Sequence, residues 1–155
     1  MPGFASRIGR ALRGRRAGEQ KLAWHRPEFA GPETLTVTSP AFGNGEHMPA
    51  STAGKGIGDE ISPALAWAGV PASATRLTLI VQDPDVPLPV AITHARIAEI
   101  APETTSIAEG GIRKWHGPRP IPGHGPHSYV FQLFAYDEAG KVVARGRLDG
   151  IYEQF

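Results

Sequence analysis

Residues 117–136 read GPRPIPGHGPHSYVFQLFAY, a Gly/Pro-rich loop that runs directly into a strand-forming segment. Seven of its first ten residues are Gly or Pro, which excludes both a helix and a ladder-paired strand there. The residues that follow are rich in aromatic and β-branched types, as strands are. Proline stiffens the loop, and glycine lets its backbone approach a ligand. We therefore predict a binding site at which the loop aims His127 and Tyr129, which share one strand face.

The rest of the body also has the pattern of short strands. Apolar and β-branched runs separated by Gly/Pro/Asn-rich connectors occur at residues 34–38, 65–67, 76–82, 92–100, 129–137 and 142–144. No window of a dozen residues keeps a helical period. Strands without intervening helices favour antiparallel sheets packed as a β-sandwich, a mainly β fold with few short helices.

Length and composition limit the classes of protein. A chain of 155 residues without cysteine fits one domain with neither disulfides nor thiolate chemistry. Its apolar runs are far shorter than the ~18 residues of a membrane span, and it begins without an apolar signal-peptide core, so we expect a cytoplasmic protein. Residues 1–31 carry a net charge of +5 and residues 32–155 a net charge of −4. An acidic body argues against nucleic acid as a partner.

The basic segment before Gly31-Pro32 is predicted to be a separate extension. Residues 1–31 are expected to form a flexible N-terminal tail, followed by one β-sandwich domain at residues 32–155. Phe4, Ile8 and Leu12 fall at helical spacing among arginines. The alternative is therefore a basic amphipathic helix that touches an anionic membrane surface or a partner.

Two carboxylates follow the predicted strand 76–82, in the sequence DPDVP at residues 83–87. Asp83 and Asp85 continue the parity of the strand's core face, so both would emerge on that side if the backbone stays extended. His94 and His127 are the cations available to them. Alternatively, each Asp caps a backbone amide in a turn, and His94 is an ordinary strand residue.

Together these segments resemble the phosphatidylethanolamine-binding protein family, in its bacterial, Raf-kinase-inhibitor-like branch. The resemblance extends from residue 35 to residue 134. It is carried by residues 61–67 with Val70-Pro71, by residues 83–87 with His94 seven residues after Pro87, and by residues 117–134.

The resemblance implies a pocket for a small anion, phosphate or carboxylate, such as a phospholipid head group, with no cofactor. The positions carried over as ligand-binding are Asp83, Asp85, Pro87, His94, Gly117, Pro118, His127 and Tyr129. Asp83 and Asp85 are expected to raise the pKa of His94 or His127, so that a protonated imidazole and the tyrosine hydroxyl donate to the anion. The resemblance also implies possible regulation of a partner protein such as a kinase or protease.

Two departures from the family pattern stand out. Ala91-Ile92-Thr93 replaces the tryptophans that usually precede the His, which removes an aromatic pocket wall. The helix that bacterial members usually carry before the final strand is missing, because residues 138–141 lead almost directly into residues 144–153. The surface under that helix would be exposed, or covered by the N-terminal extension or by a second subunit in a homodimer.

The alternative function is a hydrolase. It would use His127 as a base, or a metal held by Asp83, Asp85, His94 and His127. No serine-nucleophile motif and no His-x-x-x-His spacing is present, so binding without catalysis is the preferred prediction.

Overall fold

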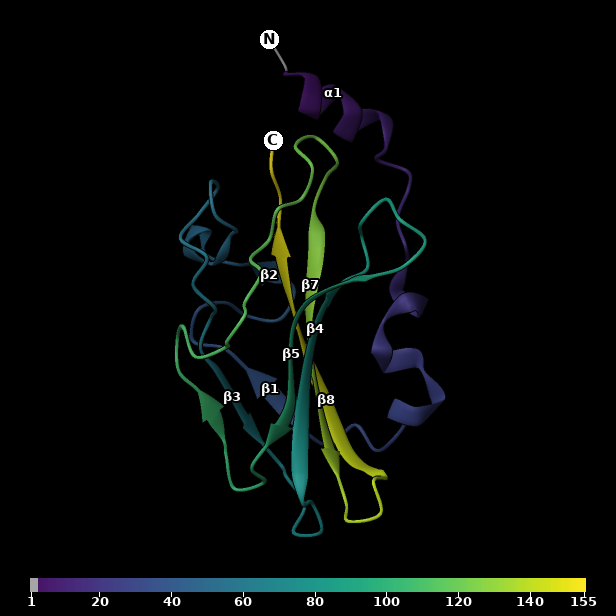
Figure 1. The fold of residues 1–155 in the computed structure, drawn as a ribbon, viewed down its shortest axis with the longest axis vertical. Helices are drawn as coiled ribbons and strands as arrows, with labels where there is room; N and C mark the ends of the chain where they lie inside the picture. The colour runs from purple at the N-terminus through teal and green to yellow at the C-terminus, as the bar shows by residue number, and fades with distance from the viewer. Residues whose placement is uncertain (1–2) are drawn as a thin grey trace.

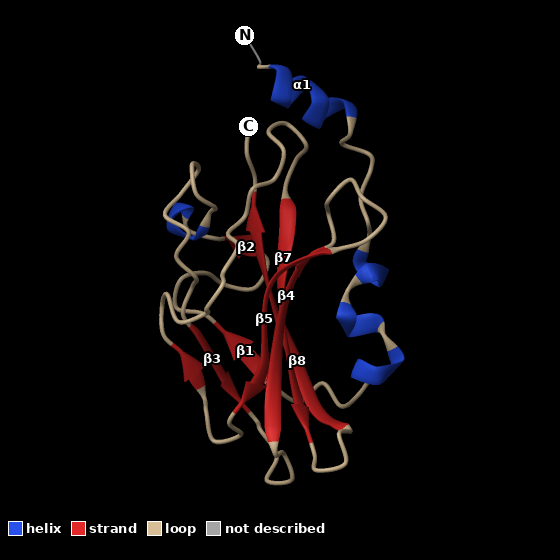
Figure 2. Cartoon of the chain, viewed as in Figure 1, coloured by secondary structure: helices blue, strands red, loops and turns tan. Residues whose placement is uncertain are grey.

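The computed structural model describes residues 3–155, so residues 1 and 2 of the expected extension lie outside it. The chain forms two β-sheets (Figures 1 and 2). The larger has the strand order β2-β8-β7-β4-β5 and the smaller β1-β3-β6, and the neighbours are antiparallel except for β2 and β8. The strands are β1 (Thr36–Thr38), β2 (Glu46–His47), β3 (Leu65–Ala68), β4 (Arg76–Asp83), β5 (Ile92–Ile100), β6 (Ser106–Ile107), β7 (His127–Tyr136) and β8 (Val142–Tyr152).

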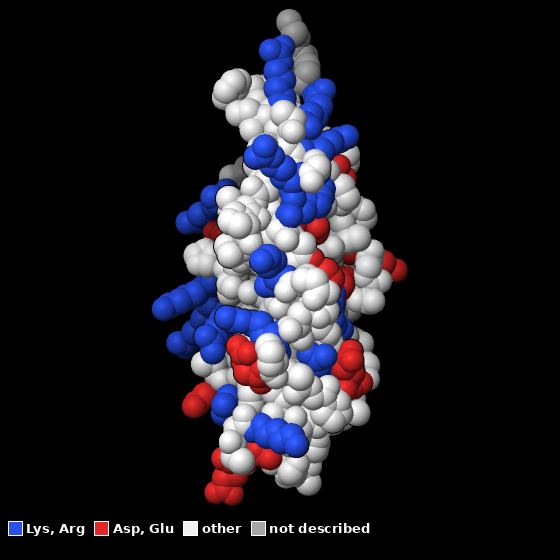
Figure 3. All heavy atoms as spheres, turned by 90° about the vertical axis from the view of Figure 1, so that its right-hand side faces the viewer, with Lys and Arg blue, Asp and Glu red and all other residues white. Residues whose placement is uncertain are grey.

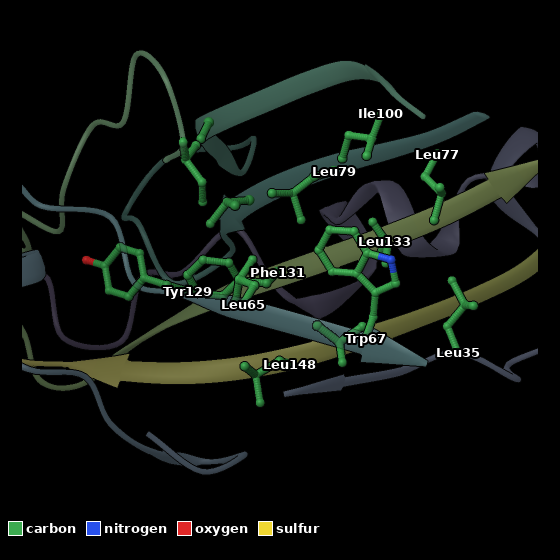
Figure 4. Close-up of a cluster of buried hydrophobic side chains, with 14 of the residues drawn as sticks. Leu35, Leu65, Trp67, Leu77, Leu79, Ile100, Tyr129, Phe131, Leu133 and Leu148 are labelled. Atoms are coloured by element: carbon green, nitrogen blue, oxygen red, sulfur yellow. The ribbon is translucent and has the colours of Figure 1, made fainter. Parts of the chain in front are cut away.

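The main core lies between the two sheets, as a sandwich requires. Figure 4 shows Trp67 of β3 facing the side chains of β4, β7 and β8 across this interior. Alternate residues of β4 and β7 supply its larger members, among them Leu77, Leu79, Phe131 and Leu133, each at most 1% exposed. The predicted antiparallel β-sandwich is confirmed.

The predicted absence of a helix before the last strand is also confirmed. β7 and β8 form a hairpin joined by a turn at residues 137–141, in which Asp137 N–H donates to the Lys141 carbonyl at 2.9 Å. β8 is longer than the expected segment 142–144, because it continues in a strict alternation of buried and half-buried residues to residue 150. The short strands β2 and β6 were not predicted.

The N-terminal segment covers the outer face of the larger sheet. Three single-turn 3-10 helices, η1 (Glu19–Lys21), η2 (Ala23–His25) and η3 (Pro27–Phe29), run along this face (Figure 2). A second apolar cluster joins them to the sheet; it consists of Leu22, Ala23, Trp24, Ile80, Val130, Phe134, Tyr136 and Val142, with Phe29 packed against it. The chain itself therefore buries the face that would otherwise be bare.

Polar contacts fix this segment in register with the sheet. The backbone N–H of Trp24 donates to Oε1 of the fully buried Gln132 at 2.7 Å. The Arg145 guanidinium donates to the Trp24 carbonyl at 2.6 Å and stacks 3.7 Å from the centre of the Trp24 ring. This arrangement differs from the flexible tail that the basic composition predicts, because burial of Leu22 and Trp24 offsets the entropy of ordering the segment.

Residues 3–18 continue to the end of the sandwich. There α1 (Phe4–Ala11) lies on the Gly/Pro-rich loop, residues 117–126 (Figure 1). A Cβ on Gly9 would lie 2.0 Å from the Pro122 carbonyl oxygen, so this contact requires glycine. Arg13 Nε donates to the Gly123 carbonyl at 2.6 Å. The loop is thus held between α1 and the body of the protein.

Candidate functional site

A cavity of about 430 Å³ lies where β4 ends and β7 begins. Its apolar wall is formed by Val86, Pro87, Leu88, Ile92, Pro120 and Ile121. Its polar groups are Glu60, Asp83, His94, His116, Arg119, His127 and Tyr129, and the backbone of Gly117 completes it. A mostly apolar hollow with a few convergent polar groups is typical of a small-molecule site.

Asp83 stands at the inner end of the cavity because it continues the core-facing side of β4, and it is only 2% exposed. One carboxylate oxygen, Oδ1, accepts from the Asp85 backbone N–H at 2.7 Å, so the turn interpretation of the DPDVP sequence also holds. The other oxygen, Oδ2, contacts His127 Nδ1 at 2.7 Å. The buried carboxylate is therefore satisfied by the protein on both oxygens.

Asp83, His127 and His124 form a continuous buried chain of hydrogen bonds. His124 Nε2 lies 2.9 Å and 3.0 Å from the carbonyl oxygens of Leu12 and Arg15, so this nitrogen carries a proton and donates it. The 2.6 Å contact between His124 Nδ1 and His127 Nε2 requires a second proton, and the contact of His127 with Asp83 a third. With these three protons, the cluster of Asp83, His127 and His124 has no net charge. An ionised Asp83 beside a protonated His127 and a neutral His124 satisfies this count. Both ring nitrogens of His127 are thereby occupied.

Tyr129 presents the one hydroxyl of the cavity wall. The residue is fully buried, and within the described residues its Oη makes no hydrogen bond of normal geometry, although the Asp83 carboxylate lies near enough to contribute to its raised pKa. Its ring packs edge-on against His94, with 5.0 Å between ring centres. Burial, with a further contribution from the charge of Asp83, raises the pKa of Tyr129 far above its usual value, so the group is a neutral donor at any physiological pH. Leaving such a group unpaired costs about 1–3 kcal/mol.

His94 differs from the expected imidazolium. Burial lowers its pKa from 6.5, an effect that the hydrogen bond to the His116 carbonyl and the charge of Asp83 oppose but do not cancel. Nδ1 contacts that carbonyl at 2.6 Å and is therefore the protonated nitrogen. Neutral His94 leaves Nε2 as an acceptor. The charge of Asp83 raises the pKa of His94, as predicted, but desolvation of the buried ring outweighs this effect. Of the two imidazoles expected to be protonated, His94 is therefore not the one.

The structure brings together six of the eight residues predicted for the site. Asp83, Pro87, His94, Gly117, His127 and Tyr129 all line the cavity, whereas two others do not. Asp85 turns away because the strand ends at Asp83; its carboxylate accepts from the Ser128 backbone N–H at 2.7 Å and pairs with Arg16 at 3.1 Å. The Pro118 carbonyl accepts from Gly54 N–H at 2.9 Å. Both are supports of the loops around the cavity.

Sequence reasoning missed three polar residues at the mouth of the cavity. Arg119 belongs to the Gly/Pro-rich loop, and its side chain lies over Gly54, where a Cβ would come 2.3 Å from Nε of Arg119. Glu60 has a positive φ of 55°, a conformation rare for a residue with a side chain, and its Oε1 accepts from Gly117 N–H at 3.4 Å. The exposed His116 is the third. Arg119 could have been predicted from its position in the loop, whereas the position of Glu60 at the cavity could not.

Two further observations concern residues 3–155. Within this range no group of three or more His, Asp or Glu side chains is arranged to hold a metal ion. No helix of the same range has the length and apolar character needed to cross a membrane.

Comparison with known proteins gives consistent relatives. The family model described as phosphatidylethanolamine-binding protein matches residues 38–151. A UPF0098 protein from Pyrococcus abyssi is 30% identical over 80% of this chain and 88% of its own length.

Two solved structures share the fold. A phosphatidylethanolamine-binding protein homologue from Chlamydia trachomatis superposes with a TM-score of 0.70 at 26% identity, over 79% of this chain and 99% of its own. YbcL from Escherichia coli, described as a member of the mammalian PEBP family, superposes with a TM-score of 0.72 over 77% of this chain and 98% of its own, at 22% identity.

Proposed function

Since the chain belongs to the phosphatidylethanolamine-binding protein family, we propose that its cavity binds a small anion, a phosphate or carboxylate such as the head group of a phospholipid. The family alone does not specify the ligand. The chemistry of the cavity wall supports this choice in three steps, which concern the hydroxyl of Tyr129, the ring of His94 and the charges at the mouth.

The observation that carries the proposal is the unpaired hydroxyl of Tyr129. A buried donor without a partner is costly, and natural proteins leave few of them. An acceptor oxygen placed in the cavity would receive this hydrogen bond in a desolvated setting. Hydrogen bonds to charged acceptors contribute about 1.5–3 kcal/mol, so an anion gains more from this donor than a neutral ligand does.

His94 makes the expected binding dependent on pH. The ring is neutral in the free protein, with Nε2 as an acceptor. An anion beside it would favour the imidazolium and raise the pKa of His94. Binding of a fully ionised anion is therefore accompanied by proton uptake, and affinity increases as the pH falls from the pKa of His94 in the bound state toward its lower pKa in the free protein.

The mouth of the cavity carries one charge of each sign. Glu60 and Arg119 both line the cavity, whose wall also contains the apolar side chains of Leu88 and Ile92. A zwitterionic head group would find an acceptor for its ammonium in Glu60 and a second cation for its phosphate in Arg119. We therefore expect phosphoethanolamine to bind more tightly than inorganic phosphate.

The test is a titration of the whole chain with phosphate, acetate and phosphoethanolamine, followed by NMR of the histidine rings and by calorimetry in two buffers of different ionisation enthalpy. We expect the His94 signals to shift and the heats to reveal proton uptake. Tyr129→Phe should weaken binding about tenfold or more, the effect of losing one charge-assisted hydrogen bond. Tyr136→Phe, the same change on the same strand but outside the cavity, is the matched control. Unshifted His94 signals at millimolar concentrations of all three ligands would reject the proposal.

Binding is better supported than hydrolysis. The hydrolase alternative uses His127 as its general base, which requires a ring nitrogen within reach of substrate, but both nitrogens of His127 already contact protein groups. Ser128, its neighbour, belongs to the opposite face of β7, which leaves Tyr129 as the hydroxyl on the cavity wall. Elemental analysis of the purified protein checks the metal-dependent variant of the hydrolase, which a stoichiometric metal would favour.

A further inference from the structure

Helix α1 is docked with its apolar side outward. The residues buried against the Gly/Pro-rich loop are small, Ser6 and Gly9, and Ser6 Oγ donates to the Gly3 carbonyl within its own turn. Phe4 and Ile8, one turn apart, form the opposite stripe and are 81% and 39% exposed. A surface helix normally turns such a stripe toward the core. The stripe of α1 is free for another surface.

Other exposed apolar side chains gather at the same end of the molecule. Leu88 and Val90 stand in the connection between β4 and β5, and Ile92 is the first residue of β5. The N-terminal segment joins this connection through Ala17 N–H, which donates to the Val86 carbonyl at 2.9 Å. Phe155 is 94% exposed and follows Gln154, whose carbonyl accepts from Gly123 N–H at 2.9 Å. Of the large hydrophobic residues exposed in the described chain, Ile61 alone lies elsewhere, in a separate shallow hollow.

The charge of this end is strongly positive. Residues 3–18 contain five arginines and no acidic residue. Arg7 and Arg10 are exposed, and neither side chain forms a hydrogen bond or ion pair within the described part of the chain. Figure 3 shows Lys and Arg side chains dominating the upper end of the molecule, where α1 lies. Exposed apolar tips flanked by free cations are typical of helices that lie in a membrane interface.

We propose that this end of the protein docks on an anionic lipid bilayer. Phe4 and Ile8 would enter the boundary between head groups and acyl chains, while Arg7 and Arg10 contact lipid phosphates. Leu88, Val90, Ile92 and Phe155 add further apolar tips. We refer to these residues together as the docking end.

The chemistry of the docking end favours lipid over other occupants. A second copy would bring the same five arginines of residues 3–18 against themselves, and like charges repel. Nucleic acid would neutralise the arginines but offers no apolar layer for Phe4 and Ile8. An anionic bilayer offers both negative charge for the arginines and an apolar layer for Phe4 and Ile8. The attraction contributes about 1 kcal/mol of binding free energy per cation near the surface, and the apolar tips are buried below the phosphates.

Docking in this way places the cavity beside the bilayer. Leu88 and Ile92 belong both to the docking end and to the cavity wall, and α1 lies on the loop that supplies Pro120 and Ile121 to that wall. The inference goes beyond the proposed ligand, since it depends on side chains that face outward and would stand if the cavity bound nothing.

The experiment is co-sedimentation of the whole chain with vesicles of phosphatidylcholine, without or with about one third phosphatidylglycerol. We expect sedimentation with the anionic vesicles only, and its reversal at about 1 M salt, where charges are screened within about 3 Å. Phe4→Ser with Ile8→Ser should lower the partition coefficient at least about tenfold. Ile61→Ser, which changes an isoleucine that is 37% exposed outside the docking end, should not.

Charge is tested separately. Arg7→Gln with Arg10→Gln should lower partitioning at least about tenfold, whereas Arg26→Gln with Lys141→Gln, two exposed cations away from the docking end, should change it little. Equal partitioning of the wild type into neutral and anionic vesicles, or unchanged partitioning of both α1 double variants, would overturn the proposal. A dimer of the wild type in sedimentation without lipid, absent from the Phe4→Ser, Ile8→Ser variant, would also overturn it. The apolar stripe of α1 would then bind a second copy of the chain.

Discussion

Substitution of Leu22 by alanine tests whether the N-terminal segment is part of the folded unit. Leu22 is fully buried between the segment and the outer face of the larger sheet, in a cluster with Ile80 and Phe134. The change removes three carbon groups at about 0.8 kcal/mol each, to which an unfilled cavity adds. We expect the free energy of unfolding to fall by about 3 kcal/mol, which lowers the melting temperature of a chain of this size by roughly 6–12 °C.

The assay is urea unfolding followed by both tryptophan fluorescence and far-ultraviolet circular dichroism. Trp24 lies in the segment and Trp67 and Trp115 in the main core, so coincident transitions show that both regions unfold together. Leu88→Ala, a leucine that is 47% exposed, is the control and should change stability by no more than about 0.5 kcal/mol. A loss below about 1 kcal/mol for Leu22→Ala would contradict the burial of Leu22 and favour the flexible tail. A fluorescence transition that precedes the dichroism transition would do the same.

Three other outcomes follow from the structure. Gly9→Ala should release α1 and speed its cleavage by trypsin several-fold, whereas Gly14→Ala, where a Cβ meets nothing within 4 Å, should leave the rate unchanged; equal rates would contradict the docking. NMR titration of the free protein should give His94 a midpoint below 6.5. Because the unfolded chain binds this proton more tightly, the contribution of His94 to stability is complete above pH 6.5 and declines as the pH falls toward its folded pKa; a midpoint at or above 6.5 would contradict this. Tyr129→Phe should stabilise the ligand-free protein by about 1 kcal/mol in thermal unfolding, since it removes an unpaired buried hydroxyl; a loss of stability would show that the hydroxyl already has a partner.

The two-residue period of strands allowed much of the sandwich and part of the cavity to be predicted. The alternation of side chains along β4 correctly predicted that Asp83 lies on the core-facing side, at the inner end of the cavity. The same argument failed for Asp85, because the extended backbone that it assumes ends at the turn after Asp83. The extent of β8 was underestimated, since its half-buried positions hold Arg145, Arg147 and Asp149, which do not look like strand residues.

The N-terminal segment shows why a local pattern can mislead. Trp24 and Phe29 fall in single-turn helices, and Leu22 lies in the bend between η1 and η2. The three residues follow no regular period, and each has a charged or polar neighbour. Their burial depends on a sheet face built from residues more than fifty positions away. The sequence did predict that no helix precedes the last strand, and the structure shows the N-terminal extension, one of the covers considered for an exposed surface, packed on the outer face of the larger sheet.

The long reach of that cover has a consequence for how the protein is made. Arg145 of β8 donates a hydrogen bond to the carbonyl of Trp24, which lies 121 residues earlier in the chain. Arg147 binds Glu19, which lies 128 residues earlier. During translation the early segment emerges long before its partners in β8 exist. Contacts of such wide separation also slow folding, because a large loop must close before they form. Leu22, Trp24 and Phe29 therefore stay exposed on the ribosome until the final hairpin has been synthesised. Chaperones would bind the chain during this period.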